Sequence, residues 1–345
     1  MIYWFRLFLA ALLLASPLAH ATDDDLDYLK ELEPYKASET VNGTIRIWGN
    51  PYIPELVQAW EDGFRVHHPD IEFVTRLKGT EAAMAGLYAD IADVVFIGRE
   101  PYRPEIRAFE DWFGYPPTGI KITSGSYATQ HKTFALMVYV HKDNPLAGMS
   151  LAQLDAIYSA ERRRGAAEPI RTWGQLGLGG EWASRPIHVY GYNFDTGMAG
   201  FFRMTVMRDS DRWNPELKDF DNGRTPSGEV INAGTYILDA VAKDVAGIGF
   251  ANVLFENPGV KRIALASAGD AFVLPSKENA WRRRWPLTRY STAFINRKPG
   301  QPVDAKVREF LRYVLSRDGM AAVVKDGAFL PLDEATLKQQ LKALD

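Results

Sequence analysis

The chain of 345 residues contains no cysteine. This absence excludes disulfide scaffolds, thiolate metal sites, thiol catalysis and a lipid-modified N-terminal cysteine. An excess of positive charge is missing as well, because 40 Lys and Arg stand against 43 Asp and Glu and leave a net charge of −3. Bulk electrostatic capture of nucleic acid or of an anionic membrane surface is therefore not expected, and an anionic ligand would need a local binding site.

Sequence signatures of catalysis and of cofactor binding are missing too. The chain has no Gly-x-Ser-x-Gly nucleophile motif and no Gly-Lys-Ser/Thr phosphate loop, which removes the usual basis for a hydrolase or an NTPase. Gly177-Leu178-Gly179-Gly180 does not complete a dinucleotide fingerprint, and no His-x3-His pair is present to bind a metal. We expect a protein that is not an enzyme and that has no cofactor and no metal. A periplasmic hydrolase would require an activated nucleophile that these patterns do not supply.

The N-terminus carries the apolar run that bears on membrane targeting, and no later stretch approaches 18 continuous apolar residues. Residues 7–15 follow Arg6 and are too few to cross a bilayer comfortably, and Ala19-His20-Ala21 forms a small-x-small cleavage pattern. We expect residues 1–21 to be a cleavable secretory signal, with an N-terminal membrane anchor as the alternative. Residues 22–42 are acidic and weakly patterned, and we expect a tail or a short helix there, ahead of the first domain. The mature protein should then be periplasmic, without direct insertion into the membrane.

The rest of the chain alternates between strand-like and helix-like segments. Hydrophobic residues make up 46% of the sequence, and a chain of this length favours about two domains with a sizeable core. Strands that alternate with helices indicate an α/β fold with largely parallel sheets. The expected strands are 44–49, 70–74, 93–98, 134–140, 187–191, 247–251 and 290–296, and the expected helices are 54–67, 82–90, 150–158, 198–207 and 307–315.

Four loops that follow predicted strands carry residues suited to binding an anion. In open α/β sheets, ligands lie beyond the carboxyl ends of strands, where helix N-termini offer free N–H groups and the positive end of the helix dipole. Glycine permits close backbone approach, Asn and Thr cap helices or donate hydrogen bonds, and Arg99 supplies a planar guanidinium. The candidate ligand-binding residues are Asn50, Tyr52, Gly79, Thr80, Arg99, Asn193, Asp195, Thr196 and Gly197.

The order of these loops and of further motifs resembles the phosphate-binding proteins of ABC importers, which have the type II periplasmic substrate-binding fold. The resemblance extends over residues 43–332. Each motif is short, so the resemblance depends on their collinear order. The segments that carry it are 49–60, 77–84, 89–94, 138–146, 150–158, 172–177, 246–250, 285–289 and 310–319.

This resemblance implies a two-lobed molecule and a transport function. Each lobe would be a mixed, largely parallel sheet flanked by helices, and two crossover strands would join the lobes. Lobe 1 would comprise residues 43–138 together with the return strand and C-terminal helices of 291–345, and lobe 2 would comprise residues 139–290. The protein would capture a small oxyanion, with phosphate the leading candidate, close its lobes over it by a hinge movement, and deliver it to an inner-membrane ABC permease.

One loop departs from the family pattern. The family's fourth loop carries an Arg followed by Ser-Gly-Thr, whereas this chain has Tyr190 at the Arg position and clearly retains only Thr196 of the triplet. Asp195 beside a dianion would be repulsive if its carboxylate faced the cleft. The departure leaves an alternative, in which the protein is a periplasmic interaction or signalling module with a degenerate ligand cleft.

Overall fold

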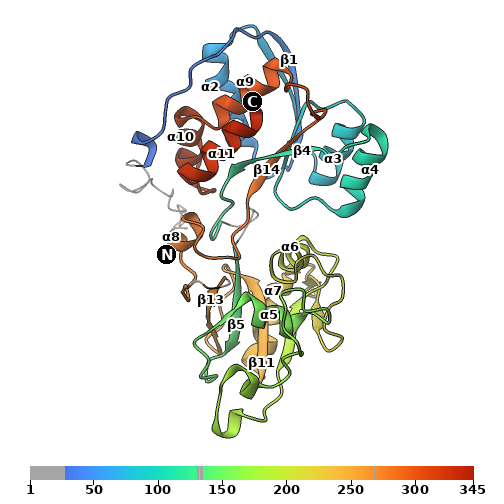
Figure 1. Ribbon diagram of the computed structural model, residues 1–345, viewed down its shortest axis with the longest axis vertical. Helices are drawn as coiled ribbons and strands as arrows, with labels where there is room; N and C mark the ends of the chain where they lie inside the picture. Colours follow the sequence, from blue (N-terminus) through green and yellow to red (C-terminus); the bar gives the residue numbers. More distant parts are fainter. Residues whose placement is uncertain (1–27, 130–131, 133–134, 268, 270) are drawn as a thin grey trace, which may run out of the picture.

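The computed structural model describes residues 28–129, 132, 135–267, 269 and 271–345. The predicted secretory signal and the first residues of the predicted tail lie outside the described residues. Two lobes stand one above the other in Figure 1, with the chain crossing between them. None of the helices in the described part of the chain is both long and apolar enough to cross a membrane.

Lobe 1 contains a five-stranded sheet with the strand order β2-β1-β3-β14-β4. β1 pairs in parallel with β2 and β3, whereas β14 runs antiparallel to β3 and β4. Because β14 comes late in the chain, the chain leaves this lobe after β4 and returns to complete its sheet. The strands are β1 (Gly43–Gly49), β2 (Ile71–Arg76), β3 (Val94–Ile97), β4 (Thr118–Thr123) and β14 (Ser291–Ile295).

Both faces of the lobe 1 sheet are covered, as the uninterrupted apolar strand β3 requires. Val94 and Phe96 belong to the core beneath α2 and α9, whereas Val95 and Ile97 belong to a separate cluster with α3 and α4. Figure 1 shows α2, α9, α10 and α11 on one side of the sheet and α3 and α4 on the other. These helices are α2 (Pro54–His67), α3 (Thr80–Tyr88), α4 (Arg103–Phe113), α9 (Ala305–Val314), α10 (Arg317–Asp326) and α11 (Glu334–Leu344).

The described part of the segment that precedes β1, which starts at Tyr28, packs on lobe 1. Tyr28 and Tyr35 are 8% and 7% exposed and join the core of this lobe. The Tyr35 hydroxyl lies 2.7 Å from both His68 Nε2 and a Glu309 carboxylate oxygen. Although the segment is acidic in composition, its buried aromatic side chains, Tyr28 and Tyr35, determine where it lies on lobe 1.

Lobe 2 contains a second five-stranded sheet, with the order β12-β5-β11-β7-β8. β11, β7 and β8 are parallel, and β5 runs antiparallel to its neighbours β11 and β12. The strands are β5 (Leu136–His141), β7 (His188–Tyr192), β8 (Lys218–Phe220), β11 (Gly247–Asn252) and β12 (Val260–Arg262). Two short ladders complete the lobe, formed by β6 (Gly148–Ser150) with β13 (Ala264–Ala266) and by β9 (Gly223–Arg224) with β10 (Val230–Ile231).

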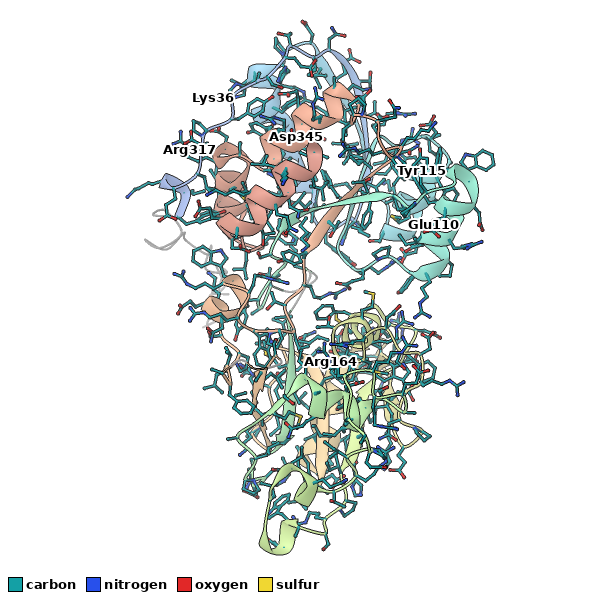
Figure 2. All side chains as sticks on the ribbon, viewed as in Figure 1. Lys36, Glu110, Tyr115, Arg164, Arg317 and Asp345 are labelled. Carbon is teal, nitrogen blue, oxygen red and sulfur yellow. The ribbon has the colours of Figure 1, made fainter. Side chains whose placement is uncertain are left out.

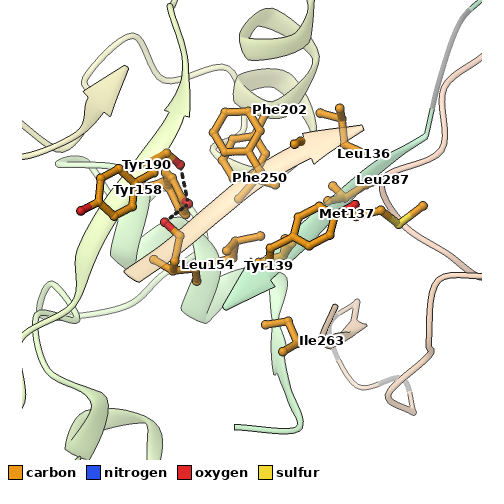
Figure 3. Packing of buried hydrophobic residues seen from close by; sticks show 14 of the residues in the cluster. Leu136, Met137, Tyr139, Leu154, Tyr158, Tyr190, Phe202, Phe250, Ile263 and Leu287 are labelled. Atoms are coloured by element: carbon orange, nitrogen blue, oxygen red, sulfur yellow. Dashed lines mark hydrogen bonds between the residues drawn. The ribbon is translucent and has the colours of Figure 1, made fainter. Parts of the chain in front are cut away.

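Helices of lobe 2 pack against this sheet around an aromatic centre. Phe202 stacks on Phe250 with ring centroids 3.9 Å apart, and the Tyr158 hydroxyl donates to the backbone oxygens of Tyr190 and Ile248 at 3.1 and 3.3 Å (Figure 3). One buried phenol thereby ties a helix to two neighbouring strands. The helices are α5 (Leu151–Tyr158), α6 (Gly197–Val206), α7 (Ala233–Ala242) and α8 (Lys277–Trp281), with 3-10 turns at Trp173–Leu176 and Gly180–Trp182.

Two crossover segments join the lobes, one between β4 and β5 and one leading into β14. They lie side by side, because Leu136 N donates to Leu287 O at 2.9 Å and Trp285 Nε1 donates to Leu136 O at 2.8 Å. The predicted two-lobed α/β fold is thereby confirmed. The residue boundaries proposed for the lobes stay a prediction.

Candidate functional site

A cleft of about 530 Å³ lies between the lobes, at the carboxyl ends of β1, β7 and β11. Seven of the nine candidate residues line it. The lining residues are Asn50, Pro51, Tyr52, Gly79, Thr80, Glu81, Gly98, Arg99, Lys132, Tyr192, Thr196, Gly197, Met198, Asn222, Asn232, Ala233, Asn252, Phe255 and Arg289. Both lobes and both crossover segments therefore contribute to one cleft.

The first loop of lobe 1 is held by close backbone contacts. A Cβ on Gly49 would lie 2.8 Å from Phe96 O, so only glycine fits where β1 ends. Asn50 N donates to Phe96 O at 2.9 Å, and Asn50 Oδ1 accepts from Tyr52 N at 2.9 Å. Gly79 N donates to Gly49 O at 3.1 Å, which fixes the second loop against the first. These bonds place both loops at one side of the cleft.

The second loop presents the N-terminus of α3 to the cleft. Gly79 has φ 137° and ψ 152°, a conformation that residues with a Cβ rarely adopt, and no side chain caps the helix. Thr80, the first helical residue, is 8% exposed and lines the cleft. The Glu81 carboxylate bonds its own N–H. The Thr80 N–H and the positive end of the helix dipole are directed to the cleft.

Arg99 is a fixed cation at the end of β3. Its guanidinium donates to both Glu105 carboxylate oxygens at 2.8 and 2.7 Å and to Glu81 at 3.2 Å, and it lies 3.7 Å from the Tyr102 ring centroid. Burial alone would lower the pKa of Arg99, but these carboxylates raise it above its ordinary value. Among the described residues its buried Nε has no partner.

On lobe 2, the fourth loop presents the N-terminus of α6. Thr196 is the N-cap residue, with its hydroxyl oxygen accepting from Ala199 N at 3.2 Å and its proton donated to Asn193 O at 2.8 Å. A Cβ on Gly197 would lie 3.5 Å from Arg99 Cδ, so the two lobes approach each other closely at this point. The far end of α6 is held by Arg164, labelled in Figure 2, whose Nε donates to Val206 O at 2.6 Å.

Two candidate residues of this loop lie away from the cleft. Asn193 directs its amide to Asp219 Oδ2 at 2.6 Å and accepts from Asp195 N at 3.0 Å, so local bonds occupy both ends of the side chain. Asp195 is exposed and, with Phe194, lines a neighbouring cavity of about 650 Å³. The electrostatic conflict expected from Asp195 therefore does not arise inside the cleft.

Tyr190, which stands where the family pattern has an Arg, also points elsewhere. Its hydroxyl donates to Asp244 Oδ2 at 2.8 Å, and Tyr190 is absent from the residues that line the cleft. Burial and this carboxylate raise the pKa of Tyr190 to about 12. Tyr190 therefore does not supply the cleft with a donor in place of the guanidinium that the family pattern has at this position.

Arg289, which is not among the nine candidate residues, reaches the cleft from the second crossover segment. It is 3% exposed and donates to Glu100 Oε2 at 2.5 Å and to Met198 Sδ at 3.5 Å. Since Glu100 follows β3 and Met198 opens α6, this side chain contacts both lobes. The segment 285–289 had been noted as a family motif, but its charge partner lies 189 positions away and leaves no local signal.

A second set of ion pairs joins the lobes beside the cleft. Arg103, the first residue of α4, donates to Asp209 Oδ2 at 2.7 Å and also bonds Asp211. Arg203 of α6 binds the same two carboxylates. The cluster is partly exposed, and it connects the start of α4 to the loop after α6.

The cleft has the chemistry of an anion site. The N-termini of α3, α6 and α7 open on it, because Thr80, Gly197 and Ala233 all line it. Arg99 and Arg289 add two fixed guanidiniums, each paired with a carboxylate. In the part of the chain that the structure describes, no group of three or more His, Asp or Glu could hold a metal ion.

Comparisons with known proteins agree with this architecture. Residues 35–318 match the family described as PBP superfamily domain. A phosphate-binding protein PstS from Pseudomonas aeruginosa is 30% identical over 314 residues, which cover 91% of this chain and 90% of that protein. Protein SphX from Synechococcus elongatus is 23% identical over 94% of this chain and 85% of its own. The crystal structure of PstS from Borrelia burgdorferi, 13% identical, covers 84% of this chain and 99% of its own with a TM-score of 0.52, which supports the fold.

Proposed function

Since this chain belongs to the PBP superfamily, and within it to the family of phosphate-binding proteins, we propose that it captures phosphate in the cleft between its lobes. The observation that carries the proposal is the meeting of three helix N-termini and two fixed guanidiniums at one interlobe cleft. A single helix N-terminus is an ordinary feature, but three directed to one cleft favour an oxyanion.

The binding mechanism follows from the positions of the donors. Lobe 1 offers the first turn of α3 and Arg99, and lobe 2 offers the first turns of α6 and α7. An anion bound to one lobe gains the donors of the other only when the lobes close. Closure also removes water, and hydrogen bonds to the anion are stronger in that setting. The protein binds and releases its ligand without reacting with it, so its role is transport and not catalysis.

The transport setting is the periplasm. After removal of residues 1–21 the protein would diffuse there and deliver phosphate to an inner-membrane ABC permease. Support comes from the PstS relative, named a phosphate-binding protein, and from the signal-like N-terminal sequence. With a net charge of −3, the protein gathers anions through its aimed donors and not through its overall field.

Calorimetry on the protein without residues 1–21 tests the proposal. We expect saturable binding of one phosphate per chain, with sulfate, molybdate and tungstate titrated as competitors to rank oxyanion selectivity. The proposal would be overturned if phosphate produced neither heat nor a thermal shift.

A non-transport role in the periplasm is the second candidate, favoured by the position of Tyr190 outside the cleft. In that case a ligand-free or weakly liganded protein would signal through a receptor. Affinity purification from envelope extract, with and without phosphate, separates the two: recovery of a permease supports transport, and recovery of a receptor alone supports signalling.

A further inference from the structure

Lobe 2 contributes three asparagines to the cleft, and no pattern in the sequence singled them out. Asn252 is the last residue of β11 and is 5% exposed. Asn222 lies between β8 and β9, and Asn232 is the N-cap residue of α7. All three line the cleft, so three carboxamides from separate elements face one space.

Hydrogen bonds set the orientation of two of these amides. Asn222 Oδ1 accepts from Ala233 N at 2.9 Å, and Asn252 Oδ1 accepts from Leu254 N at 3.0 Å. A carboxamide has one acceptor oxygen and two N–H donors, so the donor end of each group remains. Within the described residues neither Nδ2 atom has a hydrogen-bond partner in the protein.

The third amide, Asn232, does not cap its own helix. Asn is a strong N-cap residue, yet the Asn232 side chain forms no cap hydrogen bond with α7. The helix end is set close to the cleft, because a Cβ on Gly234 would lie 2.1 Å from the Phe255 ring. The first turn of α7 and the Asn232 amide therefore both face the cleft without a capping interaction between them.

The backbone of Asn252 is held firmly in place. Asn252 N donates to the Tyr192 hydroxyl at 3.2 Å, and Asn252 O accepts from the Tyr139 hydroxyl at 3.3 Å. Burial raises the pKa of both phenols, which therefore stay neutral at physiological pH. A buried amide on a fixed backbone is suited to meet a ligand without reorganisation.

The charged side chains that line the cleft are unevenly distributed between the two lobes. Among the described residues between the two crossover segments, 136–287, no cationic side chain lines the cleft, whereas Lys132 and Arg289 reach it from the crossover segments themselves. The guanidiniums that do line it, Arg99 and Arg289, are each bonded to a carboxylate. Lobe 2 therefore has only neutral groups with which to hold an anion.

We propose that lobe 2 holds the oxyanion through the carboxamide N–H groups of Asn252 and Asn222, assisted by Asn232 and the first turn of α7, in place of a guanidinium. This inference rests on the proposed function, because it names the donors of the same site. A neutral donor attracts the anion through its hydrogen bond without adding net positive charge, so replacing it by a carboxylate turns attraction into repulsion.

Two substitutions test the inference with little change of shape. Asn252→Asp and Asn222→Asp keep an oxygen to accept from Leu254 N and Ala233 N, but they replace the donor end by an anionic acceptor. We expect calorimetry at pH 7.5 to show phosphate affinity at least about 100-fold weaker, since a lost hydrogen bond and a like charge act together. Asn222 is exposed, so its variant should fold even if Asn252→Asp does not.

A pH series distinguishes donors from structural residues. As the pH falls toward 5, protonation of the new carboxyl restores an O–H donor and removes the negative charge. The phosphate affinity of each variant, divided by that of the wild type at the same pH, should therefore rise. Asn296→Asp is the matched control, because Asn296 is exposed on lobe 1 and its Oδ1 accepts from the Tyr115 hydroxyl at 2.9 Å. Its affinity should equal that of the wild type.

The outcomes separate the inference from the proposed function. If the wild type binds phosphate and both aspartate variants bind it with affinities within threefold of the wild-type value, the inference is overturned and the proposed function stands. A weakened variant whose affinity ratio does not change with pH also overturns it, because a structural defect would behave so. Failure of the wild type to bind any phosphate overturns the proposed function.

Discussion

The two lobes offer an anion different chemistry. Lobe 1 brings tight backbone loops and a fixed cation, Arg99, whose charge is balanced at once by Glu105 and Glu81. Lobe 2 brings neutral amides and two helix N-termini. The difference shows how an acidic protein can hold an anion: the cations orient hydrogen bonds while neighbouring carboxylates cancel their long-range field.

The lobes also meet through ion pairs of two kinds. Arg289 and Glu100 are bonded with side-chain exposures of 2% and 22%, whereas the Arg103 pairs with Asp209 and Asp211 have exposures of 43% or more. A buried charge that loses its partner is costly, but an exposed pair contributes little. The substitutions below test this contrast and the contrast between the lobes.

Glu100→Gln should have the largest effect. It would leave the Arg289 guanidinium buried without a countercharge, and we expect the free energy of unfolding to fall by about 3 kcal/mol in urea denaturation. The double variant with Arg289→Met should recover much of this loss. A loss below about 1 kcal/mol in the single variant would mean that water already solvates Arg289.

Arg99→Ala should have the next largest effect, on affinity. The cleft would lose its one lobe 1 guanidinium and the surface that Gly197 touches, and we expect phosphate affinity to fall about 30-fold by calorimetry. Arg46→Ala is the matched control, because Arg46 bonds Asp93 in the same lobe at 2.6 Å but does not line the cleft. Equal affinities in the two variants would contradict a direct role for Arg99.

Arg103→Ala should have a smaller effect. The loss of an exposed interlobe pair should favour the open form slightly, and we expect phosphate affinity to fall about threefold. Because salt screens this pair, the difference in affinity between wild type and variant should become smaller as the salt concentration rises. Arg107→Ala removes a pair with Asp111 inside the same helix and should leave affinity unchanged. An effect of the control as large as that of Arg103→Ala would point to helix stability and not to lobe closure.

Acid should affect lobe 1 through His68. Burial lowers the pKa of His68, so the unfolded chain binds a proton at a higher pH than the folded chain does. This contribution to stability is complete above about pH 6.5 and is lost as the pH falls below that value. The thermal midpoint of His68→Gln should therefore change less between pH 7 and pH 5 than that of the wild type. A wild-type slope retained in the variant would assign the acid sensitivity to other groups.

Asp195→Asn should have the smallest effect. The side chain lines the neighbouring cavity and not the cleft, so we expect phosphate affinity to stay within about twofold. A clear gain in affinity on removing this carboxylate would show that the fourth loop turns toward the bound anion.

Local patterns in the sequence were sufficient for much of the fold. The helix predicted at 54–67 is α2, because apolar residues at helical spacing and Pro54 at its start define it without tertiary information. The strand predicted at 247–251 is β11. Helix α7 was missed, and with it the helix N-terminus that faces the cleft.

The candidate site was predicted only in part, because only some of its residues carry a local signal in the sequence. Gly79, Thr80 and Thr196 were found because glycine and hydroxyl residues before helices are local signals of an N-terminal anion site. Asn252 ends a buried strand without any motif, and its role depends on where lobe 1 lies. Asn193 and Asp195 share the local signal but direct their side chains away from the cleft.

The central claim is that both lobes hold one oxyanion. Arsenate, a phosphate analogue with a usable anomalous signal, can be located directly in crystals of the protein without residues 1–21. The account predicts one anomalous peak in the cleft, about 4 Å from both the Thr80 backbone nitrogen and Asn252 Nδ2, the separation that hydrogen bonds from these nitrogens to arsenate oxygens give. A peak that contacts lobe 1 alone, or one in the neighbouring cavity beside Asp195, would contradict it.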